Sequence, residues 1–176
     1  MTTGDLLTAW TIRLSMLLLF LVMVLRSHCQ SGQRIDGWLK HVWTAGFLLS
    51  VLHLLSAFHF THDWSHRAAY LETARETRQK LGFAFGAGIY FNYFFMIIWG
   101  SDVCWTWCGP QSAKRPISWA IRCGRIYLLF IAFNGVVVFK SGWLRIAGVL
   151  ATALIVGIMV REHRNRLRSE SDPSRN

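Results

Sequence analysis

The segment Val42–Phe60, with the sequence VWTAGFLLSVLHLLSAFHF, decides the fold class of this chain. It contains no Lys, Arg, Asp or Glu, and its most polar side chains are two histidines, His53 and His59. A helix needs about 20 mostly apolar residues to cross the roughly 30 Å hydrocarbon core of a bilayer, because each residue adds about 1.5 Å. The segment therefore predicts a membrane-spanning helix.

Four further segments meet the same requirement to different degrees. Arg13 lies near one end of the first segment, and Arg122 and Arg125 lie in the first half of the fourth, where their long side chains can reach back to the headgroups. We therefore expect an all-α, polytopic membrane helix bundle that forms a single domain over residues 1–168. The five predicted transmembrane helices are 6–25, 42–60, 81–100, 117–139 and 143–160.

The composition supports a membrane protein and excludes nucleic-acid binding. Hydrophobic residues make up 53% of the chain and charged residues 16%, whereas soluble domains have roughly 25% charged residues. The formal net charge is +10, but the basic residues flank apolar segments and form no separate basic face. We expect membrane lipid, and no nucleic acid, among the partners.

The distribution of Lys and Arg predicts the orientation. These residues are more numerous in the first loop, around residues 114–125 and in the C-terminal tail, which lie on one side in a five-span arrangement. The positive-inside rule places that side in the cytoplasm. We expect a bacterial-type inner or plasma membrane, an outer N-terminus and a disordered cytoplasmic tail over 169–176. Trp43 and Trp99 fall near the predicted inner interface, where indole rings are enriched.

A hydrophilic stretch follows the second span. Residues 61–80 are rich in helix formers, and Glu76 precedes Lys80 at the favourable i,i+4 spacing. This stretch predicts one short extramembrane helix, or a continuation of the second span. Beyond it, Gly82 and Gly86 predict a small-residue packing face on the third span.

The strongest candidate site is a histidine and aspartate cluster at the outer end of the second span. If the helix continues past Phe60, successive residues advance by about 100°, which puts His59, His62 and His66 on one face with Asp63 beside it. Imidazole and carboxylate groups suit a transition metal ion such as Zn, Cu, Fe or Ni. Glu72 and Glu76 are the nearest additional ligands in the sequence. The alternative is a polar rim at the headgroups, without a ligand.

Other polar groups have weaker functional signals. His53, Asn92 and Asn134 are predicted inside the membrane, where a polar side chain is either a functional group or a hydrogen-bonded packing contact. A bis-histidine haem is disfavoured, because the third, fourth and fifth spans contain no histidine. Cys104 and Cys108 share a predicted helical face, where interfacial packing or acylation is favoured over a metal cluster.

The sequence carries no motif for a nucleotide-binding loop, a nucleophile elbow or a soluble catalytic domain. We therefore expect a small membrane protein whose His/Asp cluster binds a transition metal or handles protons, and a metal-dependent enzyme stays within this hypothesis. The first alternative is a non-catalytic subunit that packs against other membrane subunits or copies of itself. The second is an oligomeric transporter or channel.

Overall fold

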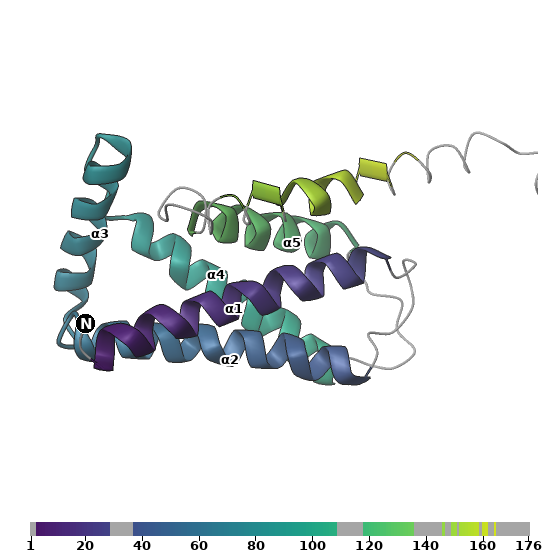
Figure 1. The fold of residues 1–176 in the computed structure, drawn as a ribbon, viewed down its shortest axis with the longest axis horizontal. Helices are drawn as coiled ribbons and strands as arrows, with labels where there is room; N and C mark the ends of the chain where they lie inside the picture. Colours follow the sequence, from purple (N-terminus) through teal and green to yellow (C-terminus); the bar gives the residue numbers. More distant parts are fainter. Residues whose placement is uncertain are drawn as a thin grey trace, which may run out of the picture.

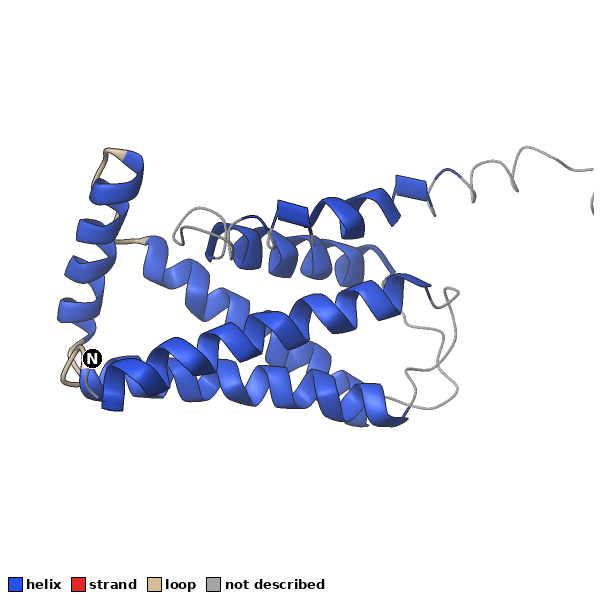
Figure 2. Cartoon of the chain, viewed as in Figure 1, coloured by secondary structure: helices blue, strands red, loops and turns tan. Residues whose placement is uncertain are grey.

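The computed structural model describes residues 3–28, 37–108 and 118–135, and within the C-terminal part residues 146, 149–150, 152–158, 160–161 and 164. Its helices are α1 (Thr3–His28), α2 (Gly37–Phe60), α3 (His66–Leu81), α4 (Gly88–Cys108) and α5 (Ser118–Phe133). Residues 149–150 and 152–158 are also helical. No strand occurs within these ranges, as Figure 2 shows, so the predicted all-α class is confirmed for them.

The axes of α1, α2, α4 and α5 lie roughly along the length of the bundle, and α3 crosses them at one end. α1 and α2 lie antiparallel along most of their lengths, α4 packs against α2, and α5 packs against α4. α3 runs across the other helices at the end where α1 begins and α2 ends (Figure 1). This end therefore carries the N-terminus of α1, the turn after α2 and the start of α4.

A close contact between three helices involves Gly46 of α2. The hydroxyl of Ser15 on α1 donates a hydrogen bond of 2.8 Å to the Gly46 carbonyl oxygen. A Cβ atom on Gly46 would lie 3.0 Å from the Trp99 ring of α4 and 3.3 Å from the Leu18 side chain of α1. Glycine thus lets three helices meet at one point, as small residues do in membrane bundles. The core around this point contains Leu19, Val22, Trp43, Trp99 and Leu128.

Two of the described helices, over Thr3–Arg26 and Gly37–Phe60, are long and apolar enough to cross a membrane. The first and second predicted spans lie inside them. α4 has 21 residues but contains Asn92 and Asp102 among many aromatic residues, which lowers its hydropathy. The apolar part of α5 covers Cys123–Phe133, which is shorter than a bilayer requires. The count of five spans stays a prediction.

The predicted position of the third span was wrong. Leu81 belongs to α3, and Gly82 ends that helix in the left-handed region with a φ of 85°, donating its N–H to the Arg78 carbonyl oxygen at 3.0 Å. Glycine adopts this conformation without the steric cost of a Cβ. α4 begins at Gly88 instead and continues to Cys108. Gly82 and Gly86 consequently precede α4, and the Tyr70 ring of α3 packs on Gly86.

The helix predicted after the second span is present as α3, but it does not continue α2. Ser65 is its N-cap, and the Ser65 hydroxyl accepts a hydrogen bond of 3.2 Å from the Ala68 N–H. Such a cap satisfies one of the unpaired N–H groups at a helix start. The predicted tail 169–176 and much of the predicted fifth span, 143–160, lie outside the described residues.

The Gly46 contact predicts a position-specific cost in stability. Gly46→Leu should lower the free energy of unfolding by about 1–3 kcal/mol, because the new side chain must displace Trp99 and Leu18. Thermal unfolding of the detergent-purified protein measures this effect. Gly37→Leu is the matched control, since a Cβ on Gly37 meets nothing within 4 Å in the described structure. Equal losses from both substitutions would contradict the close contact.

Candidate functional site

The chain turns sharply inside the predicted His/Asp cluster. α2 ends at Phe60, and Asp63 and Trp64 both adopt positive φ values, 48° and 57°. The backbone N–H of Trp64 donates to the Phe58 carbonyl oxygen at 2.9 Å, which closes the turn. His66 therefore starts a different helix from the one that carries His59. The premise that His59, His62 and His66 share one helical face was wrong.

Each histidine of the cluster contacts a different aromatic side chain. The Trp64 indole N–H donates to His59 Nδ1 at 3.3 Å, and the His62 ring lies edge-on to Phe58. His66 Nδ1 lies 3.1 Å from the Tyr93 hydroxyl. Within the described ranges, no group of three or more His, Cys, Asp or Glu side chains is arranged to hold a metal ion. The metal site stays a prediction without geometric support.

The two further carboxylates proposed as ligands lie on α3. Glu72 accepts a hydrogen bond of 2.6 Å from Arg75 one turn later on the same helix, and Glu76 is exposed. A surface pair of this kind contributes at most about 1 kcal/mol. The Glu72 carboxylate thus has a hydrogen-bond partner on its own helix, which is typical of a polar, solvated helix face.

The predicted intramembrane polar residues have ordinary packing environments. His53 Nδ1 lies 2.8 Å from the Thr8 carbonyl oxygen, which links α2 to α1. Asn134 donates from Nδ2 to the Phe130 carbonyl oxygen at 2.8 Å, within its own helical stretch. Asn92 is exposed on α4. The alternative in which His53 bonds a neighbouring helix therefore agrees with the geometry.

The structure contains a part-buried ion pair that the sequence analysis missed. Arg26 near the end of α1 and Asp102 in α4 lie 3.1 Å apart between Nη1 and Oδ2, and their side chains are 8% and 17% exposed. Charges withdrawn from water are costly unless they are paired in this way. A sequence signal existed, because Arg26 and Asp102 each lie just after an apolar segment of the chain.

One buried tryptophan, Trp43, contacts the arginine of the ion pair, and a second, Trp99, packs against Trp43. The Arg26 guanidinium lies 5.1 Å from the Trp43 ring, a distance typical of a cation–π contact, and Trp43 and Trp99 are 5.0 Å apart between ring centroids. Both side chains belong to the core, with exposures of 1% and 0%, so they pack between helices instead of lying on the protein surface. Neither indole N–H has a hydrogen-bond partner within the described part of the chain. The ion pair and the two tryptophans therefore hold α1, α2 and α4 together.

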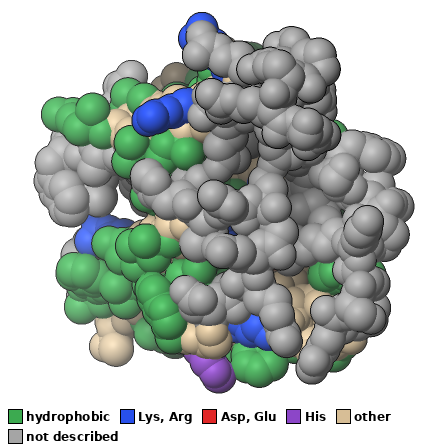
Figure 3. Space-filling model, turned by 90° about the vertical axis from the view of Figure 1, so that its right-hand side faces the viewer, with side chains coloured by type: hydrophobic (Ala, Val, Ile, Leu, Met, Phe, Trp, Pro, Cys, Tyr) green, Lys and Arg blue, Asp and Glu red, His purple; other side chains and the backbone are tan. Residues whose placement is uncertain are grey.

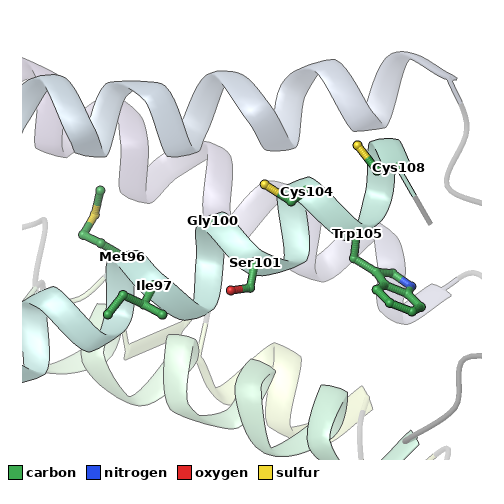
Figure 4. Close-up of a pocket in the computed structure, with 7 residues that line it drawn as sticks. All are labelled: Met96, Ile97, Gly100, Ser101, Cys104, Trp105 and Cys108. Carbon is green, nitrogen blue, oxygen red and sulfur yellow. The ribbon is translucent and has the colours of Figure 1, made fainter.

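A shallow, open groove with a volume of about 660 Å³ lies along the surface of the second half of α4. Figure 4 shows Met96, Cys104 and Cys108 pointing to one side of the helix and Ile97, Ser101 and Trp105 pointing to the other. Gly100 lies between the two rows, and a Cβ there would meet the Phe47 ring of α2 at 3.0 Å. The groove is mainly apolar and contains two thiols.

The comparisons with known proteins give no functional information. No protein-family model matches this chain. No curated protein and no solved structure matches it either. Any functional conclusion therefore rests on the residues and their geometry.

The part-buried ion pair predicts coupling between its two residues. Arg26→Met or Asp102→Leu alone should destabilise the protein by about 1–3 kcal/mol, because each leaves a part-buried charge without its partner. The double variant should regain most of that loss. Denaturant unfolding of all three variants measures the interaction as a double-mutant cycle.

The exposed pair on α3 serves as the control for this cycle. Arg75→Ala should change stability by less than about 1 kcal/mol, because water solvates the remaining Glu72. If the stability loss of the double variant equalled the sum of the losses of Arg26→Met and Asp102→Leu, the measurement would show that the two groups do not interact in the folded protein.

The predicted metal site has a direct test. If the cluster binds a transition metal, the protein purified in detergent should contain metal, and a variant with alanine at His59, His62 and His66 should lose it. Elemental analysis by mass spectrometry measures the content of both proteins. Equal, negligible metal in the two preparations would exclude the site.

Proposed function

We propose that this chain is a small multi-pass membrane protein that acts as a non-catalytic subunit and packs against the helices of a partner membrane protein. The observation that carries the proposal is a row of exposed apolar residues along α1. This row, the α1 seam, consists of Leu7, Trp10, Leu14, Leu17 and Leu21.

The low burial of the apolar helices supports a membrane location. Only 39% of the most apolar part of α1 and 22% of that of α2 is buried inside the protein. Water does not tolerate apolar helices with so much exposed surface, whereas lipid or a partner helix does. The end view in Figure 3 adds Lys and Arg side chains beside apolar ones at the end where α1 finishes. This pattern favours a cytoplasmic position for that end.

The spacing of the α1 seam supports a helical partner. Its members follow at intervals of three, four, three and four residues, which is the repeat with which helices pack side by side. A different face of α1, with Ser15, Leu19 and Val22, is buried against the rest of the bundle. The seam is therefore a second packing face that this chain does not use itself.

The polar contacts between helices support a structural role over a catalytic one. The Ser15 hydroxyl, the His53 ring and the Arg26–Asp102 pair each link two helices. Such contacts fix the positions of neighbouring helices in an environment without water. A subunit that positions other membrane helices needs this rigidity.

Photo-crosslinking in native membranes tests the proposal. A photoreactive residue at Leu17, which is 59% exposed on the seam, should give a discrete adduct with another membrane protein. The same residue at Leu48, 57% exposed on α2, is the matched control and should label mainly lipid. The membranes are washed with alkaline carbonate first, so that only embedded protein contributes.

Three outcomes would contradict the proposal. Release of the chain by carbonate would exclude a membrane location. Lipid labelling alone from Leu17 would exclude a partner at the seam. An adduct made only with a second copy of the chain would replace the hetero-subunit role by self-association.

A metal or proton-handling role for His59, His62, Asp63 and His66 is the second candidate. It is favoured by the position of all four residues at one end of the bundle, where His59 and His66 are exposed. A bound transition metal would have to draw these side chains away from their aromatic contacts. The metal measurement described above distinguishes this role.

A further inference from the structure

We propose that Cys104 and Cys108 form an acylation site, in which a long acyl chain is attached through a thioester and lies in the groove of α4. Both thiols are free and exposed, and both line the groove. They are separated by four residues, so they project from neighbouring turns of one helical face. In Figure 4 both sulfur atoms point to the same side.

The position of the two thiols fits a modification at the membrane surface. They occupy the last turns of α4, next to Trp105 and Trp107. The Trp107 indole N–H donates to the Thr44 hydroxyl of α2 at 2.9 Å, and Lys40 Nζ lies 5.9 Å from the Trp107 ring. Tryptophan and lysine together mark the boundary between lipid and water. Cysteines at such a boundary are reached by acyl donors from the aqueous side.

The groove has the dimensions of an acyl chain. It extends from Cys108 back to Met96, a distance of roughly 18 Å at about 1.5 Å per residue. One leaflet of the hydrocarbon core is roughly 15 Å deep. A chain attached at either thiol can therefore run along α4 to about the bilayer centre, in contact with Ile97 and Met96. The small side chain of Ser101 lines the groove between these residues and the thiols.

The chemical step is a thioester exchange without oxidation or reduction. The sulfur of Cys104 or Cys108 attacks the carbonyl carbon of an acyl thioester. The new carbon–sulfur bond forms as the bond to the carrier sulfur breaks, and the proton lost by the cysteine ends on the released carrier thiol. A long-chain acyl thioester is the only co-reactant required.

Cys123 provides an internal control. It is an exposed, free thiol near the start of α5, and it does not line the groove. General thiol reactivity would label Cys123 together with Cys104 and Cys108. Labelling that depends on the groove would favour the two cysteines of α4.

The experiment uses the full chain in phosphatidylcholine nanodiscs, incubated with palmitoyl coenzyme A. Peptide mass spectrometry before and after hydroxylamine should show a labile palmitoyl group on Cys104 or Cys108. We expect the palmitoylated fraction of Cys104 or Cys108 to be roughly ten times that of Cys123. Burial of about two CH₂ groups of the acyl chain in the groove is enough to give this factor. With acetyl coenzyme A the preference should disappear, because an acetyl group does not reach the groove. Equal palmitoylation of all three cysteines, or none, would overturn the proposal.

A substitution in the groove distinguishes binding of the acyl chain from the reactivity of the thiols. Ser101→Phe fills the groove and keeps both thiols, so palmitoylation of Cys104 and Cys108 should fall to the level of Cys123. Unchanged palmitoylation in this variant would overturn the proposal. The acetyl comparison uses the unmodified chain and remains decisive if Ser101→Phe fails to fold. The acylation proposal rests on the membrane location proposed above, but it requires no partner protein. The palmitoylation experiment can therefore fail while crosslinking at the α1 seam still identifies a partner.

Discussion

The contact of α1, α2 and α4 around Gly46 is the constraint on which the described bundle depends. Because Gly46 has no side chain, the Trp99 ring can reach the backbone of α2, and Ser15 can bond its carbonyl oxygen. A carbonyl that also bonds a neighbouring helix ties the two backbones together more firmly than apolar contact does. The position of Trp99 then sets that of Trp43 and, through it, of Arg26. The ion pair to Asp102 is formed at the same junction.

This junction explains why several polar residues lie between helices. In an apolar environment an unpaired charge or donor is costly, so Arg26 and Asp102 must lie where they can meet. Most of the large exposed side chains in the middle of α1 and α2 are leucines. That division, with polar contacts inside and apolar rows outside, fits a protein whose solvent is lipid and whose neighbours are other helices.

The His/Asp cluster shows how a local backbone feature can change a functional hypothesis. The predicted shared face required α2 to continue for two further turns. Instead, Asp63 and Trp64 adopt left-handed conformations, and Ser65 caps the next helix. The segment thereby becomes a corner from which the imidazoles diverge toward separate aromatic partners. The same corner sends α3 across the end of the bundle, which places Tyr93 of α4 within reach of His66.

The sequence by itself determined the all-α class, the two long apolar helices and the presence of α3, because hydrophobicity and helix propensity act within a few residues along the chain. It did not determine where α4 begins, since an apolar run gives no warning that Gly82 will end the preceding helix in a left-handed turn. Only the tertiary structure decided that Trp43 and Trp99 are core residues and that Arg26 pairs with Asp102. Those outcomes depend on which faces of separate helices come together, and side chains far apart in sequence set that choice through packing at Gly46.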